Sequence, residues 1–177
     1  MKLYVIRHGE TEINVKGLIN ARNDVGLNET GIKQAKFCSA QVKSLGIDII
    51  FCSPLKRAVE TCGYINCEKL PVIYDERLME RDAGSKQFEK VENIDTSIWY
   101  DRTLEKVYEN SEGFKNILRR VTLFLEDMKK EYKNENILIV THGDIFKAIY
   151  VYFNPNIKDK DISKYEKLNC EVCEFLF

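Results

Sequence analysis

Short apolar runs alternate with segments of helical periodicity along most of the chain. Residues 3–6 form one apolar run that leads directly into Arg7 and His8, and residues 137–141 form another that leads directly into His142. Runs of this length, rich in β-branched residues and ended by polar turns, are typical of strands that are buried on both faces. We therefore expect a sheet that is covered by helices on both sides.

The same patterns predict the remaining elements. Further strands are expected at residues 47–52, 71–74 and 170–177, a short helical turn at residues 10–16 and a surface loop at residues 20–26. Longer helices are expected from an N-cap at Asn28 to Gly46, from an N-cap at Ser53 with Pro54 as the first helical residue, over residues 112–133 and over residues 144–153. Serine followed by proline is a strong signal for a helix start.

Alternation of strands and helices predicts an α/β fold. We expect one domain over residues 1–177, with the polar segment 85–112 as a lid over a site. No apolar run approaches the ~20 residues that a membrane helix needs. The net charge of −1 gives no reason to expect nucleic acid or a membrane surface as a partner. The apolar run at the start is too short for a signal peptide, so the expected compartment is the cytoplasm.

The six cysteines are scattered along the chain, which is typical of reduced thiols. Cys170 and Cys173 form a C-x-x-C pair that could combine with Cys62 and Cys67 in a zinc site. The strand-like alternation of residues 170–176 argues against this, because positions i and i+3 of a strand point to opposite faces. We expect no metal.

Both histidines of the chain occupy the same local context, since each follows an apolar run and precedes a glycine. One histidine after a strand is usually a satisfied turn residue, but a repeated arrangement is harder to explain in that way. Ligands of such sheets bind beyond the carboxyl ends of the strands. We expect His8 and His142 to meet at that edge with Arg7 and with Arg57, which would lie in the first turn of its helix.

Two guanidinium groups and two imidazoles form a pocket for a doubly charged anion, and phosphate is the best fit. The chain has no Gly-rich phosphate loop and no aspartate cluster for magnesium, which disfavours nucleotide or two-metal chemistry. A neutral imidazole can attack phosphorus and form phosphohistidine. The leaving alkoxide then needs a proton, and the acid-rich segment 75–82 is where a protonated carboxyl group is expected.

Five motifs in this order resemble the histidine phosphatase superfamily, in its phosphoglycerate-mutase-like branch. The motifs are Arg7-His8-Gly9-Glu10-Thr11 with Asn14, Leu27-Asn28 with Gly31, Gln34 and Ala35, Ser53-Pro54-Leu55 with Arg57 and Thr61, Leu78 with Glu80 and Gly84, and Thr141-His142-Gly143. The resemblance runs from about residue 3 to residue 150. It implies a three-layer α/β/α sandwich around a mostly parallel sheet, without a metal or other cofactor.

The resemblance also implies roles for single residues. His8 matches the nucleophile that becomes phosphorylated, and Glu80 matches the general acid that later activates water. The phosphate pocket and the substrate contacts would include Arg7, Thr11, Asn14, Arg57, His142 and Gly143. Glu76 and Asp82 stay open as other proton donors. After Gly84 the chain departs from the aromatic, glutamate and glycine that are common in relatives, and the departure weakens any assignment of substrate.

A phosphatase must admit water, whereas a mutase must hold two phosphate groups and exclude water. The segment 85–112 is shorter than the insertion of the mutases and carries seven acidic and four basic residues, which is a poor place for a second anion. We therefore predict hydrolysis of a small phosphate ester. The alternatives are mutase-type transfer of the phosphoryl group and a binding module that has lost turnover. Sugar phosphates, α-ribazole phosphate and phosphoglycerate remain open as substrates, and the sequence does not indicate an oligomeric state.

Overall fold

A computed structural model describes residues 2–177, which contain a five-stranded sheet with the order β3-β2-β4-β1-β5. The strands are β1 (Lys2–Arg7), β2 (Ile49–Cys52), β3 (Val72–Tyr74), β4 (Asn136–Thr141) and β5 (Val172–Leu176). Four of them are parallel, and β5 runs antiparallel to β1 at one edge. The mostly parallel sheet that the sequence predicts is therefore confirmed.

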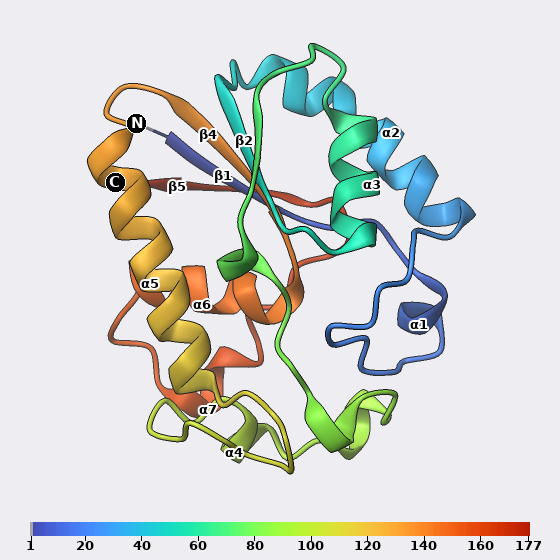
Figure 1. Cartoon of the computed structure of the whole chain (residues 1–177), viewed down its shortest axis with the longest axis vertical. Helices are drawn as coiled ribbons and strands as arrows, with labels where there is room; N and C mark the ends of the chain where they lie inside the picture. Colours follow the sequence, from blue (N-terminus) through green and yellow to red (C-terminus); the bar gives the residue numbers. More distant parts are fainter. Residues whose placement is uncertain (1) are drawn as a thin grey trace.

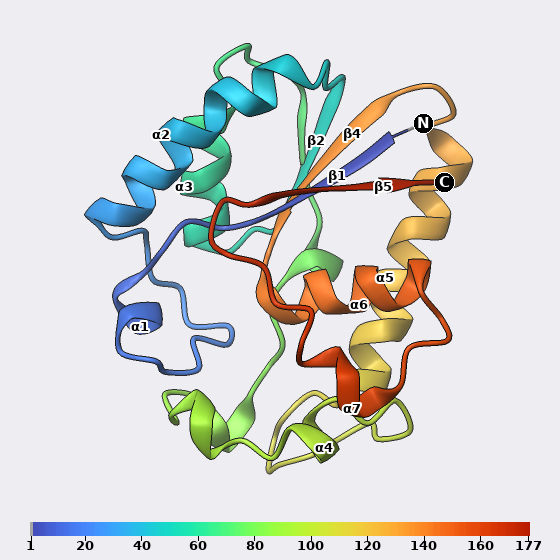
Figure 2. The same cartoon turned by 180° about the vertical axis from the view of Figure 1, so that it is seen from behind.

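Long helices cover both faces of this sheet. They are α2 (Glu29–Ser44), α3 (Lys56–Ile65), α5 (Phe114–Glu131) and α6 (Gly143–Phe153). The pair α2 and α3 lies on one face, and α5 and α6 lie on the other (Figures 1 and 2). Alternate residues of β1 point to opposite faces of the sheet. Tyr4 and Ile6 pack with α2 and α3, while Leu3 and Val5 pack with α5 and α6. This is the expected α/β/α sandwich.

The start of α3 differs from the sequence prediction. The helix begins at Lys56 with Leu55 as its N-cap, and since leucine cannot cap, Asp24 Oδ1 accepts from the Lys56 amide at 2.7 Å. The prediction of a cap at Ser53 with Pro54 in the first helical position was wrong. The Ser53 hydroxyl accepts a hydrogen bond from Leu55 N at 3.3 Å, but it also lies 2.7 Å from Nε2 of His142. A tertiary contact thus occupies the hydroxyl group, and the helix starts after a turn.

Short elements fill the connections between the long ones. They are α1 (Glu12–Val15), η1 (Glu76–Leu78), η2 (Gly84–Lys86), η3 (Val91–Asn93), α4 (Thr96–Trp99) and α7 (Asp159–Ile162), where η marks a 3-10 helix. The stretch from η2 to α4 lies below the sheet in Figure 1, on the side toward which β1 and β4 run. No helix within residues 2–177 is both long enough and apolar enough to cross a membrane.

The register of the two central strands brings the histidine turns together. Arg7 at the end of β1 pairs with Thr141 at the end of β4. The next backbone amide, that of His8, donates to the Thr141 oxygen at 2.9 Å. His8 and His142 therefore leave neighbouring parallel strands at the same level, although well over a hundred positions separate them in the sequence.

Candidate active site

The two imidazole rings are neighbours in a buried setting. Their centroids lie 5.1 Å apart with a 57° angle between the ring planes. Both side chains are almost inaccessible, at 2% exposure for His8 and 0% for His142. The structure thus places side by side the two residues that the sequence singles out.

Hydrogen bonds fix which nitrogen of His8 can act. Nδ1 lies 2.7 Å from the backbone oxygen of Gly9, and since a carbonyl can only accept, Nδ1 carries the hydrogen. Nε2 then keeps its lone pair. Nε of Arg57 donates a hydrogen bond to this lone pair at 3.1 Å. The nitrogen that is free to attack phosphorus is therefore the one beside a guanidinium group.

The two predicted arginines are held from behind by backbone oxygens. Arg57 is fully buried, and its terminal nitrogens donate to the oxygens of Ala21 and Asn23 at 2.8 Å each. Arg7 donates through Nη1 to Glu166 Oε1 at 3.0 Å and to the oxygen of Lys167 at 2.9 Å. These bonds leave Nε of Arg57 to donate to His8, and they leave Nε of Arg7 buried without a partner within residues 2–177.

Nε of Arg7 and Nδ1 of His142 are among the buried atoms that have no hydrogen-bond partner within residues 2–177. Buried polar atoms are nearly always paired, so an unpaired set marks a place for a ligand. The Ser53 hydroxyl accepts from a backbone amide and can donate its proton to Nε2 of His142. Nδ1 of His142 then carries a hydrogen and can donate to an anion.

Both histidines are poor proton acceptors in this setting. Burial lowers the pKa of His8 well below its usual value, and the charges of Arg57 and Arg7 lower it further. Burial and the Arg57 charge do the same to the pKa of His142. A neutral imidazole is the nucleophilic form, and it is therefore available over a wide pH range.

Glu80 is the one acid of the segment 75–82 that lines the pocket, as Glu76 and Asp82 do not. Its Oε1 accepts from the Arg81 amide at 2.9 Å. Burial raises the pKa of Glu80, and the charge of Asp144 raises it further. The geometry favours Glu80 over the two other candidates as a proton donor.

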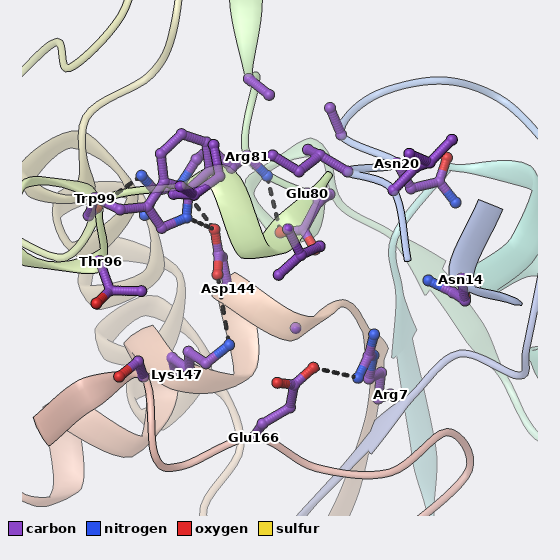
Figure 3. Close-up of a pocket in the computed structure, with 18 of the residues that line it drawn as sticks. Arg7, Asn14, Asn20, Glu80, Arg81, Thr96, Trp99, Asp144, Lys147 and Glu166 are labelled. Atoms are coloured by element: carbon purple, nitrogen blue, oxygen red, sulfur yellow. Dashed lines mark hydrogen bonds and ion pairs between the residues drawn. The ribbon is translucent and has the colours of Figure 1, made fainter. Parts of the chain in front are cut away.

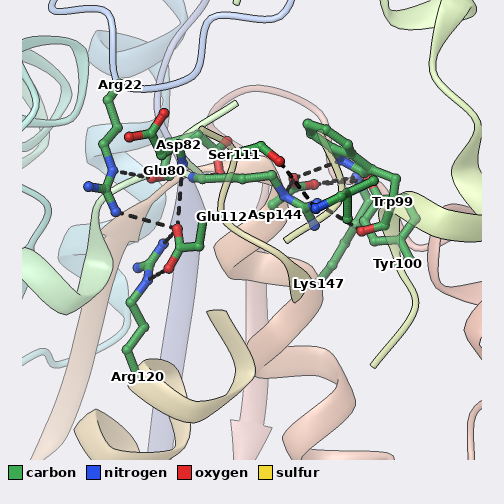
Figure 4. Close-up of polar contacts among 12 residues, drawn as sticks. Arg22, Glu80, Asp82, Trp99, Tyr100, Ser111, Glu112, Arg120, Asp144 and Lys147 are labelled. Carbon is green, nitrogen blue, oxygen red and sulfur yellow. Dashed lines mark hydrogen bonds and ion pairs between the residues drawn. The ribbon is translucent and has the colours of Figure 1, made fainter. Parts of the chain in front are cut away.

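Side chains from distant segments hold the irregular stretch around Glu80. Arg22 donates through Nε to the backbone oxygen of Glu80 at 3.2 Å and also pairs with Glu112 (Figure 4). Glu112 in turn pairs with Arg120 of α5 at 2.8 Å. The hydroxyl of Thr141 donates to the Leu78 oxygen at 2.8 Å. No sequence pattern predicts this support, since its members are far apart along the chain.

The smaller predicted contacts divide into two kinds. Asn14 and Gly143 line the pocket, whereas Thr11 does not. Thr11 is fully buried, caps α1 and donates to Asn14 Oδ1 at 3.0 Å, so it holds the asparagine.

Residues 20–26 were predicted as a surface loop, and this is wrong at their start. Asn20 and Ala21 are buried and line the pocket, because the loop folds inward to bind Arg57.

A second group of polar residues, which the sequence analysis missed, lines the other half of the pocket (Figure 3). Asp144 of α6 accepts from Trp99 Nε1 at 3.1 Å and from the Tyr100 hydroxyl at 2.9 Å. Arg81 Nε lies 2.8 Å from the same carboxylate. Lys147 lies one helical turn further along α6. The whole pocket has a volume of about 230 Å³.

The expected absence of a metal can be compared with the donor groups. Within residues 2–177, no cluster of three or more His, Cys, Asp or Glu side chains has the arrangement of a metal site. The six cysteines are all free thiols, and the pairs 62/67 and 170/173 do not come together in such a cluster.

The fold and the site together define a phosphoryl-transfer enzyme that is built around paired histidines. The histidine phosphatase superfamily (branch 1) matches residues 3–177, and the chain belongs to this family. The family that the sequence motifs suggested is therefore confirmed, and with it the use of a phosphohistidine on small phosphate esters.

Relatives and solved structures agree with this membership. Phosphoserine phosphatase 1 of Hydrogenobacter thermophilus is 29% identical over 182 residues, which cover 99% of this chain and 84% of that protein. An uncharacterized phosphatase of Bacillus subtilis, PhoE, is 33% identical over 146 residues, covering 82% and 73%. The phosphoserine phosphatase of Entamoeba histolytica, solved with 3-phosphoglyceric acid, has a TM-score of 0.86 at 29% identity and covers 99% of this chain and 90% of that one.

Proposed function

We propose that the protein hydrolyses small phosphomonoesters and that His8 is the residue that becomes phosphorylated. The observation that carries this proposal is the set of groups around Nε2 of His8. The Arg57 guanidinium is in contact with this nitrogen, and unpaired donors of Arg7 and His142 are buried beside it. A phosphoryl group with two negative charges would satisfy all of these donors at once.

In the first step, Nε2 of His8 attacks phosphorus, the phosphorus–oxygen bond of the ester breaks, and Glu80 donates its proton to the leaving oxygen. In the second step, the Glu80 carboxylate takes a proton from water, the oxygen of that water attacks phosphorus, and the phosphorus–nitrogen bond breaks. The raised pKa of Glu80 supports this double role, because a carboxyl group that titrates closer to neutrality can give and take a proton. Arg7 and Arg57 stabilise the charge on the transferring group.

The side of the pocket that the lid forms favours hydrolysis over mutase-type transfer. The segment 85–112, which we propose as the lid of a single domain, contributes Val91, Ile94, Thr96, Trp99 and Tyr100 to the pocket. None of these carries a positive charge, so the lid offers no partner for a second phosphate dianion. A mutase would need one.

The size of the pocket limits the substrate. Its volume of about 230 Å³ lies below the ~300–1,000 Å³ of sites that enclose drug-sized ligands. An ester of a few carbon atoms therefore fits better than a nucleotide-like ester such as α-ribazole phosphate. The names of the relatives, which include phosphoserine phosphatases, agree with a small substrate.

The thiols are consistent with the cytoplasm as the compartment in which the protein works. All six cysteines are free, and four of them are buried. Proteins of oxidising compartments commonly form disulfides, whereas reduced thiols are the rule in a reducing one.

The experiment is to incubate the protein with a phosphodonor, quench it in acid or base and measure the bound label. Wild type should carry an acid-labile, base-stable label, and His8→Ala should carry none and lose more than about 10³-fold in kcat. Circular dichroism would verify that the variant is folded. Full hydrolytic activity of His8→Ala would refute the mechanism, and anion binding without turnover in wild type would favour the binding module.

A further inference from the structure

The ammonium group of Lys147 is a charge in the pocket to which the proposed mechanism assigns no role. The residue is 5% exposed and lines the pocket on the side opposite Arg7 (Figure 3). Its Nζ lies 3.7 Å from Asp144 Oδ1, which is too far for a hydrogen bond, and no hydrogen bond to Nζ is formed within residues 2–177. A buried ammonium group with its donors free is costly unless an anion completes it.

Asp144 shares its one negative charge between Lys147 and several other donors. Oδ2 faces Trp99 Nε1 and Arg81 Nε, and Oδ1 accepts from the Tyr100 hydroxyl. Although burial alone would raise the pKa of Asp144, the charges of Arg81 and Lys147 bring it below its usual value. Asp144 is therefore a carboxylate, and one negative charge faces two positive charges.

The surplus positive charge of this cluster extends to Arg81. Its side chain is 1% exposed and stacks over the Trp99 ring, with 4.0 Å between the guanidinium carbon and the ring centroid. Its Nη2 is buried without a hydrogen-bond partner within residues 2–177. The cluster of Arg81, Asp144 and Lys147 thus keeps a net charge of +1 in the pocket wall.

No other acid of the pocket neutralises this charge. Glu80 must be protonated to act on the leaving group, and its raised pKa favours that state. Glu166 pairs with Arg7 at 3.0 Å, not with Lys147. The phosphoryl group would lie beside His8, Arg57 and Nε of Arg7, so the donors of Lys147 Nζ remain free for another acceptor group of the substrate, away from its phosphate.

We propose that Lys147 binds a carboxylate on the alcohol part of the substrate. The inference rests on the proposed function and names its substrate class as phosphate esters of small hydroxy acids. A carboxylate offers two acceptor oxygens to the free donors of Nζ, whereas a second phosphate dianion would place two negative charges beside the Asp144 carboxylate. A lysine is suited to this task, because its compact charge and three rotatable donors can meet a carboxylate at the end of a short chain.

The first test compares substrates that differ only in this group. Wild type should hydrolyse 3-phosphoglycerate with a kcat/KM about 10–100-fold higher than glycerol 3-phosphate, and phosphoserine should exceed phosphoethanolamine by a similar factor, as expected for a charge-assisted hydrogen bond. Equal kcat/KM values within each pair would overturn the subsite and leave the hydrolase intact. Failure of wild type to hydrolyse any of the four esters would refute the proposed function itself.

The second test uses the side chain. Lys147→Met should remove the preference for 3-phosphoglycerate, mainly through a higher KM, and should change kcat/KM for glycerol 3-phosphate by less than about 3-fold. Lys147→Arg, which keeps the charge, should retain most of the preference. Lys164→Met is the matched control, since Lys164 is exposed and pairs with Asp161 outside the pocket. It should leave both substrates unaffected.

Two outcomes with these variants would contradict the proposal. One is an equal loss on both esters together with a shifted pH profile, which would mean that Lys147 acts through the charge of Glu80. The other is a Lys147→Met enzyme that keeps the preference. If Lys147→Met does not fold, the substrate comparison in wild type decides the question alone.

Discussion

Glu80 illustrates how the environment of one residue sets its chemistry. A carboxyl group in water is ionised at neutral pH and has no proton to donate. Burial and the neighbouring Asp144 charge raise the pKa of Glu80, because both oppose a second negative charge in the same wall. The hydrogen bond from the Arg81 amide and the charge of Arg57 act in the opposite direction and lower the pKa. The result is a group that can alternate between acid and base.

Replacement of Glu80 should therefore affect leaving groups unequally. In Glu80→Gln, the first turnover of an alkyl phosphate should slow by about 10²–10⁴-fold, because the alkoxide leaves without a proton. The first turnover of p-nitrophenyl phosphate should change by less than about 10-fold, since the nitrophenolate needs no proton. Rapid-quench measurements would give both rates. Equal slowing of the two esters would contradict the role as general acid, and Asp82→Asn is the matched control because Asp82 lies outside the pocket.

The turn that carries His8 depends on close contact between two elements. The start of α2 packs directly on the turn after β1, and glycine occupies both sides of the contact. A Cβ on Gly31 would lie 2.2 Å from the backbone oxygen of Glu10, and a Cβ on Gly9 would lie 2.6 Å from the Gly31 oxygen. No side chain fits in this space. The absence of side chains thus lets α2 support the backbone beside the nucleophile.

Two alanine substitutions in helices should have opposite effects on stability. Gly31→Ala should lower the free energy of unfolding by about 1–3 kcal/mol, because the backbones must separate. It should also reduce kcat, since the His8 turn moves with them. Gly63→Ala in α3 should raise the free energy of unfolding by up to about 1 kcal/mol, since a Cβ there meets nothing within 4 Å and alanine favours the helix. Urea titrations would measure both changes, and stabilisation by Gly31→Ala would refute the packing argument.

The folded protein buries two histidines in the neutral form, and this links its stability to pH. The pKa values of His8 and His142 are lowered in the folded state, mainly by burial. Below about pH 6.5 the unfolded chain therefore binds more protons than the folded one, and stability falls as the pH falls. Glu80 acts in the opposite sense, because its raised pKa lets the folded state hold a proton better. The two histidines therefore outweigh Glu80 in the dependence of stability on pH.

Stability should consequently decrease between pH 7 and pH 5.5. The expected loss is about 1–3 kcal/mol, since each histidine contributes up to about 1.4 kcal/mol per pH unit below its unfolded pKa and Glu80 offsets part of this. Urea unfolding at both pH values would measure the loss. In His8→Ala the pH dependence should be clearly smaller, because one titrating group is gone. An unchanged or higher stability at pH 5.5 would show that the imidazoles are not held neutral.

The sequence by itself determined the sheet, most helices and the reactive residues near the strand ends. Apolar runs and helical periodicity are local properties, so they place β1, β4 and α5 to within a few residues. His8 and His142 were identifiable because each directly follows a strand. Glu80 was found through the resemblance to the family, since its own segment has no regular pattern.

Only the tertiary structure decided which groups meet across the pocket. Lys147 and Asp144 are three positions apart on α6, but the contacts of Asp144 with Trp99 and Tyr100 of the lid depend on how segments some 45 positions apart pack together. The inward path of Asn20 depends likewise on the fold around Arg57. Periodicity encodes which face of an element is buried, but it does not encode which distant partner that face will meet. The chemistry was therefore readable from the chain, whereas the proposed preference for a carboxylate emerged from the folded pocket.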